Sequence, residues 1–213
     1  MLKQLLATQT RVMGADNTDT VLTKQSLAQL YRDKGDYQAA ETLLDNVLET
    51  RLRLQGAQHP NTLMAMNDFG VLYLSQRRYP QAEATFEQAL EGRRKALGNE
   101  HPDTLITIMG LAESRLLQGE YVEAETVSRE GLNAYQKKDP DNWRRFHMAS
   151  LLGSSLAGQK KFAEAEPLLV SGYEGLRQRE GTMPAASRVK IDQARTRLSQ
   201  MYHDSGKPQK AQF

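Results

Sequence analysis

The chain has 213 residues, of which 39% are hydrophobic, 28 are basic and 26 are acidic, and it contains no cysteine. The charges are mixed along the chain, so no basic block or acidic tail predicts binding to nucleic acid or to a membrane surface. The absence of cysteine excludes disulfides, thiolate zinc sites and a cysteine nucleophile. No apolar run approaches the ~18 residues that cross a bilayer, and we therefore expect a soluble, cytoplasmic protein.

A short motif recurs along the chain at a nearly constant spacing. Its aromatic markers are Tyr37, Tyr79, Tyr121 and Phe162, which stand 42, 42 and 41 residues apart. An alanine follows each marker by three positions, and a small residue precedes it by nine. A fixed period of this length is typical of stacked repeats, and the apolar offsets place one stripe on each of two helices. Each unit is therefore predicted to be a helical hairpin.

The pattern predicts helices in chain order at residues 18–34, 37–55, 60–76, 79–97, 102–118, 121–136, 142–158, 161–179 and 185–205. Gly35 and Gly119 stand where a helix end commonly adopts a left-handed conformation, and Pro80 suits the first turn of a helix. Residues 1–13 align with residues 43–55 and predict the second helix of a preceding unit. Residues 198–211 align with a fifth unit, in which Pro208 takes the aromatic position.

The predicted organisation is one repeat array over residues 1–213, in which each unit contacts its neighbours. Its parts are the second helix of a truncated preceding repeat (1–14), repeat 1 (15–56), repeat 2 (57–98), repeat 3 (99–139), repeat 4 (140–181) and a partial repeat 5 (182–213). Because both ends fall within a repeat, we expect the chain to be a segment of a longer protein.

A large apolar residue precedes each small one, in the pairs Leu27-Ala28, Phe69-Gly70, Leu111-Ala112 and Leu152-Gly153. With this large–small pair, its tyrosine and its second-helix alanine, the motif resembles the tetratricopeptide repeat. The 42-residue period and the His-Pro-Asn/Asp-Thr-Leu linkers, at residues 59–63 and 101–105, resemble the kinesin-light-chain type of that repeat. The resemblance implies an all-α, right-handed superhelix (α-solenoid) of antiparallel helical hairpins. The sequence from Trp143 onward resembles the repeat regions that follow bacterial serine/threonine protein kinase domains, which implies a larger signalling protein.

The histidines and carboxylates do not predict a catalytic or metal site. His59 and His101 occupy equivalent linkers, but neighbouring repeats stand about 8–10 Å apart, too far to share one metal ion. We therefore expect both to serve the linkers and helix caps, and His147 and His203 to be structural. The sequence contains no phosphate-binding loop, zinc-protease motif or kinase signature, so we expect no enzyme, no cofactor and no metal.

The resemblance implies that ligand contacts come from the first helices, at positions twelve, eight and five before each aromatic marker. We call these the groove positions. They are Gln25, Gln29 and Arg32; Asn67, Val71 and Leu74; Met109, Glu113 and Leu116; and Ser150, Ser154 and Ala157. This mixture of amides and apolar side chains is suited to holding a peptide by hydrogen bonds and apolar anchors.

Asn67 is the strongest single candidate, because its amide can both donate to and accept from a peptide backbone. Arg32 is the only cation among the groove positions, so we predict no clamp for an acidic C-terminal peptide. The expected function is a scaffold that binds a protein or peptide partner, without nucleic acid or membrane. The alternative is a structural or oligomerisation module with no peptide ligand of its own, which dimerises or spaces domains through the exposed apolar faces of its incomplete end repeats.

Overall fold

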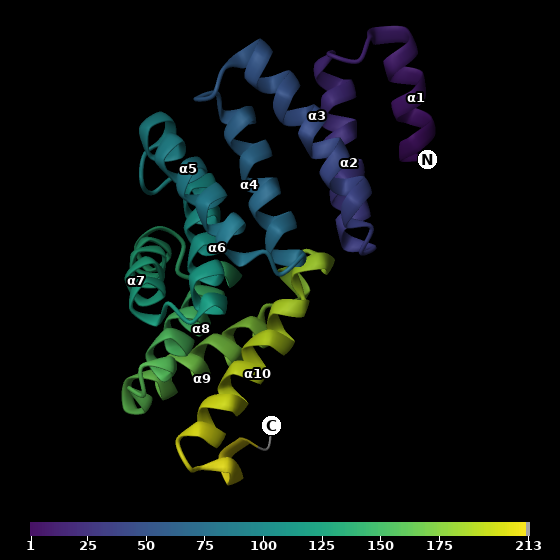
Figure 1. Ribbon diagram of the computed structural model, residues 1–213. Coiled ribbons are helices and arrows are strands. Elements are labelled where there is room, and N and C mark those ends of the chain that lie inside the picture. Colours follow the sequence, from purple (N-terminus) through teal and green to yellow (C-terminus); the bar gives the residue numbers. More distant parts are fainter. Residues whose placement is uncertain (212–213) are drawn as a thin grey trace. The chain divides into compact units, whose positions relative to one another are not determined.

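The computed structural model describes residues 1–211, and this part of the chain is helical throughout, without a strand. The helices are α1 (Leu2–Met13), α2 (Thr18–Asp33), α3 (Tyr37–Gln55), α4 (Pro60–Ser75), α5 (Tyr79–Leu97), α6 (Pro102–Gln118), α7 (Tyr121–Lys138), α8 (Trp143–Gly158), α9 (Phe162–Gln178) and α10 (Val189–Asp204). Short 3₁₀ turns lie at Glu180–Thr182, Ala185–Ser187 and Pro208–Ala211. Figure 1 labels the helices in chain order. The all-α class and the nine predicted helices are confirmed, most of them to within two residues.

Glycines end several helices, as the sequence predicts. Gly35 and Gly119 have φ angles of 80° and 81°, in the region that residues with a Cβ rarely adopt. Pro80 lies in the first turn of α5, where its missing N–H costs no helical hydrogen bond. The local sequence thus specifies the turns at Gly35 and Gly119, whereas Arg77 and Lys160 adopt the left-handed conformation in the α4–α5 and α8–α9 turns.

The helices form two compact units, one from Met1 to Gly110 and one from Leu111 onward, and the division falls within α6. In the first unit the core runs along the seams between helices. One cluster joins residues of α2, α3 and α4, namely Ala28, Ala40, Leu44, Phe69 and Leu72. Each hairpin therefore buries its apolar face against its own partner and the next hairpin, as expected for stacked repeats.

Small residues allow the closest helix contacts in the first unit. The ring of Phe86 on α5 lies between Gly70 on α4 and Gly110 on α6 and is fully buried. A Cβ added at Gly70 or Gly110 would lie 2.6 Å or 2.5 Å from that ring. Gly70, nine positions before Tyr79, and Gly110 are therefore packing requirements, because any larger side chain would displace the Phe86 ring.

The second unit repeats this arrangement with different side chains. A Cβ at Gly153 on α8 would lie 2.7 Å from Leu169 on α9. Near the other end of the same two helices, the Phe146 ring packs on Gly175, where a Cβ would lie 1.9 Å from the ring. The guanidinium groups of Arg145 and Arg179 lie 4.5 Å and 4.1 Å from the centre of this ring. Phe146 therefore anchors the α8–α9 pair.

The helix predicted at 185–205 is wrong at its start. Residues 185–187 form a 3₁₀ turn, and α10 begins at Val189. The segment before α10 has one buried apolar side chain, Met183, while residues 184–186 are exposed. Because no apolar stripe packs there, tertiary contacts do not stabilise a longer helix. Residues 212 and 213 of the partial repeat 5 lie outside the described part of the chain.

The structure confirms that the linker histidines cap helices. His59 Nδ1 accepts a hydrogen bond from the backbone N–H of Asn61 at 3.1 Å, and His101 Nδ1 accepts one from Asp103 at 3.2 Å. Each histidine therefore satisfies an N–H group that the first turn of its helix leaves without an intrahelical partner. Thr62 and Thr104 each donate a hydrogen bond to the glycine that ends the preceding helix.

Candidate functional site

The first groove position of the first unit is part of a buried polar network. Gln25 on α2 is 4% exposed, accepts a 2.8 Å hydrogen bond from Arg51 on α3, and donates to Asp68 on α4. Gln29 lies 3.5 Å from the same carboxylate. Burial raises the pKa of Asp68, although hydrogen bonds from Gln25 and Gln29 and the charges of Arg32 and Arg51 oppose this effect. This network links three helices, so Gln25 has a structural role.

Asn67 lies in the equivalent network of the next repeat. Its side-chain oxygen accepts a 3.2 Å hydrogen bond from Thr107 on α6 and lies 3.5 Å from Arg93 on α5. Arg93 also donates to the Thr107 hydroxyl at 2.6 Å and to the Asp103 carbonyl at 2.5 Å. Because Asn67 is 7% exposed, its oxygen is engaged within the protein. The same groove position thus joins neighbouring repeats in both hairpins.

In the second unit, the groove position Glu113 on α6 is the centre of a buried charge cluster. Lys190 on α10 donates to both carboxylate oxygens at 2.8 Å and 2.9 Å. Arg197 on α10 lies 3.6 Å from Glu113 and 3.5 Å from the Ser150 hydroxyl. His147 on α8 is completely buried, 3.9 Å from Glu113, and neither ring nitrogen has a hydrogen-bond partner.

The pKa shifts in this cluster follow from burial and charge. Burial alone would raise the pKa of Glu113, but Lys190, His147 and Arg197 together hold it well below its ordinary value. Burial lowers the pKa of His147 to about 4, although Glu113 opposes this effect. Glu113 is therefore ionised and His147 neutral at pH 7. Glu113 and Ser150 thus interact with α10, 77 and 47 residues further along the chain.

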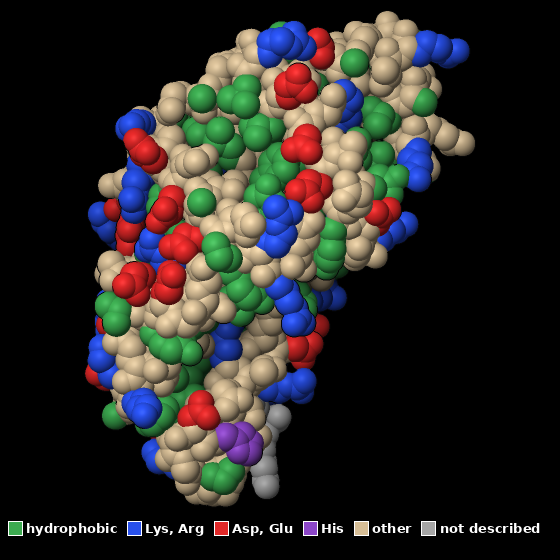
Figure 2. All heavy atoms as spheres, viewed as in Figure 1, with side chains coloured by type: hydrophobic (Ala, Val, Ile, Leu, Met, Phe, Trp, Pro, Cys, Tyr) green, Lys and Arg blue, Asp and Glu red, His purple; other side chains and the backbone are tan. Residues whose placement is uncertain are grey.

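The remaining groove positions of the second unit line an open pocket of about 310 Å³. Its apolar lining is Leu116, Leu117, Tyr121, Ala157 and Met201. Its polar lining is Ser154, Thr196, Arg197, Gln200 and Asp204. The surface over this unit is hollowed, with apolar side chains in the hollow (Figure 2). A few polar groups around an apolar floor are typical of a pocket that fixes the orientation of a ligand.

Gly158 shapes the floor of the pocket. A Cβ at this position would lie 2.4 Å from the ring of Tyr121, which is 37% exposed. Any larger residue would therefore shift the ring. The glycine lets the aromatic face of Tyr121 lie against α8 beside Leu117, so that the floor combines aromatic and aliphatic surface.

The structure thus brings together three of the predicted groove residues, Leu116, Ser154 and Ala157, in one pocket. Four others are buried polar groups in networks, namely Gln25, Asn67, Glu113 and Ser150. Arg32 pairs with Asp33 at 2.7 Å. Gln29 is exposed, and Val71, Leu74 and Met109 are half-buried on their helices. The first unit therefore offers separate positions, whereas the second offers a formed pocket.

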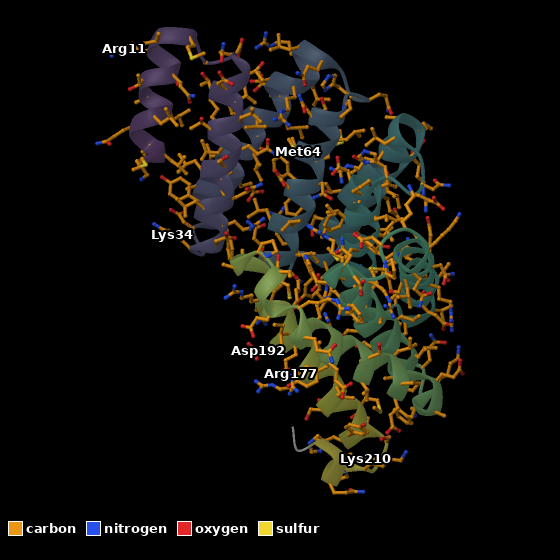
Figure 3. All side chains as sticks on the ribbon, turned by 180° about the vertical axis from the view of Figure 1, so that it is seen from behind. Arg11, Lys34, Met64, Arg177, Asp192 and Lys210 are labelled. Carbon is orange, nitrogen blue, oxygen red and sulfur yellow. The ribbon has the colours of Figure 1, made fainter. Side chains whose placement is uncertain are left out.

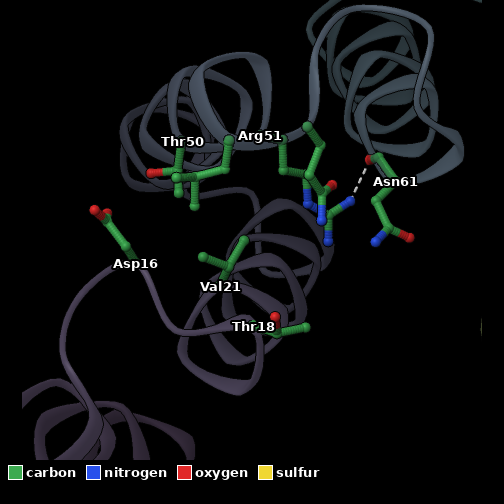
Figure 4. A pocket seen from close by; sticks show the side chains of 8 residues that line it. Asp16, Thr18, Val21, Thr50, Arg51 and Asn61 are labelled. Atoms are coloured by element: carbon green, nitrogen blue, oxygen red, sulfur yellow. Dashed lines mark hydrogen bonds between the residues drawn. The ribbon is translucent and has the colours of Figure 1, made fainter.

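A smaller cavity of about 30 Å³ lies in the first unit between Asp16, Val21, Thr50 and Arg51. Figure 4 shows Arg51 at its wall, with the hydrogen bond that it donates to the Asn61 carbonyl. A volume of this size holds about one or two water molecules. It is too small for a peptide side chain with its backbone, so the cavity is not a candidate for partner binding.

Sequence reasoning missed several residues of these sites. Arg51 and Arg93 are 42 residues apart, so the repeat period itself could have identified them as equivalent. Thr196 and Gln200 lie twelve and eight positions before Pro208, which makes them groove positions of the partial repeat 5. The contact of Lys190 with Glu113 had no sequence signal, because the long connection before α10 obscures the register.

Two general features of the described residues concern metal ions and membranes. Residues 1–211 contain no group of three or more histidine, aspartate or glutamate side chains able to hold a metal ion. Within the same range, every helix is too short or too polar for a membrane span. The surfaces that the structure forms include helix faces and open pockets on the second unit. One pocket of about 300 Å³ is lined by polar residues of α10 and by Ala211, whereas the pocket described above combines polar and apolar residues from several helices.

A sequence model of the tetratricopeptide repeat matches residues 19–95 and 73–137. No curated protein sequence matches the chain. A crystal structure of nearly identical TPR-like repeats, described as those of a kinesin light chain from Podosopora anserina, has a TM-score of 0.71 at 21% identity, covering 90% of both chains.

Two further solved structures share the fold. BtubC (BKLC) from P. vanneervenii has a TM-score of 0.75 at 22% identity, covering 99% of this chain and 86% of that one. PilF from Pseudomonas aeruginosa has a TM-score of 0.56 at 13% identity, covering 90% and 81%. At these identities the likeness concerns the fold of kinesin-light-chain-like helical repeats.

Proposed function

The chain belongs to the tetratricopeptide repeat family, whose repeats generally mediate protein–protein interaction, and we propose that it is a non-enzymatic scaffold that binds a partner segment in the pocket of its second unit. The observation that carries the proposal is the convergence of Leu116, Ser154 and Ala157 from successive repeats on one open pocket. The partner places a large apolar side chain over Leu116 and Tyr121. Burying such a side chain contributes about 1.5–3 kcal/mol.

The pocket supports this proposal better than the first unit does. The side-chain oxygen of Asn67 is held by Thr107 and Arg93, so a peptide that donated to this oxygen would have to replace contacts between repeats. Ser154 and Gln200 at the pocket are half-buried and exposed, respectively. Their polar atoms therefore reach a ligand without disrupting the packing between repeats.

Selection from a random 12-residue peptide library on the immobilised chain tests the proposal, followed by fluorescence anisotropy with the selected peptides. Ala157→Arg fills the pocket, and Ala57→Arg places the same charge on an exposed linker. We expect peptides that bind the native chain and Ala57→Arg but bind Ala157→Arg at least tenfold more weakly. Leu117→Glu provides a second pocket variant at a residue that is 46% exposed. Equal affinity for all four proteins would refute the pocket as the binding site.

Self-association is a second candidate function, and one observation favours it. Leu5 on α1 is 45% exposed, whereas Val47, its equivalent 42 residues later, is fully buried. The exposed face of α1 is therefore able to pack against a helix. Sedimentation over a range of concentrations should show association that Leu5→Lys removes and that Leu52→Lys, at a leucine of similar exposure, retains. A monomer at every concentration would exclude this function.

A further inference from the structure

We propose that the segment bound in this pocket carries a lysine or arginine next to its apolar anchor, and that Asp204 receives the basic group. The inference rests on the proposed function and adds the chemistry of the partner. It depends on which charge at the pocket is accessible and lacks a partner.

Two charged residues of α10 line the pocket, Arg197 and Asp204. They are seven residues apart, so they lie on the same face of the helix, about 10 Å from each other. The Arg197 side chain is only 15% exposed and lies beside Glu113 and Ser150. Asp204 is exposed at the end of α10. The more exposed of the two charges is therefore the negative one, at the Asp204 end of the pocket.

Asp204 differs from two other carboxylates of the second unit that have basic partners. Glu125 pairs with Arg129 at 2.7 Å and with Lys161 at 3.2 Å, and Glu166 pairs with Lys210 at 2.8 Å. Asp204 accepts one hydrogen bond, from the amide of Gln200 at 2.8 Å. Within residues 1–211 no ion pair to Asp204 is formed. Its charge is available to a basic group from outside the chain.

The position of Asp204 on its helix also favours a cation. It is the last residue of α10, at the end where the dipole of a helix places partial negative charge. An acidic side chain adds to this charge instead of balancing it. In α2 the corresponding terminal residue, Asp33, is paired with Arg32 at 2.7 Å. At the end of α10 a partner's lysine or arginine would provide the equivalent pairing.

The apolar lining of the pocket determines where the partner's lysine or arginine must lie relative to its apolar anchor. Leu116 and Leu117 lie at the end of α6, and Met201 lies on α10 one turn before Asp204. A side chain packed against Met201 therefore leaves its neighbours in the partner within reach of the carboxylate. We expect the lysine or arginine within about four residues of the anchor, because side chains at this separation lie on one face of a helix.

The peptides selected from the random library provide the test. We expect most pocket-binding peptides to contain a lysine or arginine close to a large apolar residue. Asp204→Asn should weaken their binding about tenfold, and Asp204→Lys more strongly. The control Asp192→Asn, on the outward side of the same helix (Figure 3), should leave binding unchanged. Replacing the basic residue of the peptide by glutamate should restore binding to Asp204→Lys.

Other results would overturn the inference in distinguishable ways. Peptides that bind the pocket without a basic residue, or that bind Asp204→Asn as tightly as the native chain, would refute the role of Asp204 and leave the proposed function intact. Absence of any peptide sensitive to Ala157→Arg would refute both. Concentration-dependent association that Ala157→Arg abolishes would assign the pocket to a second copy of the chain and would also overturn the inference.

Discussion

Arg51 and Arg93 stand 42 residues apart and make the same two kinds of contact. Each donates to a backbone carbonyl in the first turn of the next first helix, Asn61 for Arg51 and Asp103 for Arg93. Each also approaches the side-chain oxygen at the first groove position of its own hairpin, Gln25 or Asn67. These arginines are 4% and 3% exposed. They are a repeated internal connection between one hairpin and the next.

Replacement of Arg93 tests this connection. Arg93→Met retains much of the side-chain length but removes the hydrogen bonds to Thr107 and the Asp103 carbonyl. Thr107 still donates to the Asp103 carbonyl and to Asn67, but the hydrogen bonds from the buried guanidinium are lost. Because a hydrogen bond from a charged group contributes about 1.5–3 kcal/mol, we expect the free energy of unfolding to fall by about 2–3 kcal/mol. Urea denaturation followed by circular dichroism measures the change. Lys95→Met, at an exposed residue nearby, should change it by less than about 0.5 kcal/mol.

Gly175 tests the packing of Phe146. Alanine favours a helix interior over glycine by about 1 kcal/mol, but here its Cβ would lie 1.9 Å from the Phe146 ring. Overpacking of this kind costs about 1–3 kcal/mol, and the ring is confined by Arg145 and Arg179. We therefore expect Gly175→Ala to lower the melting temperature. Gly181→Ala, where a Cβ meets open space, should not; an equal or higher melting temperature for Gly175→Ala would contradict the account.

A double-mutant cycle tests the ion pair of Glu113 and Lys190. Lys190→Met leaves the carboxylate with the 3.6 Å contact to Arg197 and with His147 at 3.9 Å, so we expect a loss of about 3–5 kcal/mol in stability. The double variant Glu113→Gln with Lys190→Met removes both charges and should recover a substantial part of this loss. Additive losses in the double variant would show that the two groups do not interact.

His147 should make stability depend on pH. Its pKa is lowered to about 4 in the folded chain, mainly by burial, whereas an unfolded histidine has a pKa near 6.5. As the pH falls below about 6.5 the unfolded chain binds a proton that the folded chain does not, so stability is retained above this pH and is lost toward pH 4. The loss is on the order of 3 kcal/mol.

Comparison of His147→Leu with the native chain, by thermal unfolding at pH 7.5 and pH 5, measures this contribution. Between pH 7.5 and pH 5 the melting temperature of His147→Leu should fall much less than that of the native chain. The melting temperature of His203→Leu, at an exposed histidine, should fall as much as that of the native chain. A native chain with the same melting temperature at both pH values would contradict the assignment of a buried neutral imidazole.

The helices could be predicted from the sequence because residues at fixed positions of the repeat mark where helices begin and end. Gly35 and Gly119 stop helices, Pro60 and Pro102 begin them, and His59 and His101 cap them. The start of α10 was mispredicted because Pro184 and the exposed alanines after it resemble a helix start without an apolar stripe to support one. Local signals were correct where packing agreed with them.

The candidate site was only partly predictable. Leu116, Ser154 and Ala157 follow from the ligand positions that the resemblance to the tetratricopeptide repeat implies. The repeat register could not show that buried arginines contact the side-chain oxygens of Gln25 and Asn67. The repeat register also could not predict the ion pair of Lys190 with Glu113, because the two residues are 77 positions apart and an irregular connection lies between them. A period predicts equivalent positions, whereas the partners of each polar group depend on side chains from neighbouring repeats.

The central claim is that the pocket of the second unit binds a partner segment, and methyl NMR tests it most directly. A peptide selected on the native chain should shift the methyl resonances of Leu116, Leu117 and Met201, and should leave those of Leu52 and Leu54 on α3 unchanged. The same peptide should cause no such shifts in Ala157→Arg. Saturating shifts confined to residues of the first unit, with none at Leu116, Leu117 or Met201, would contradict the account.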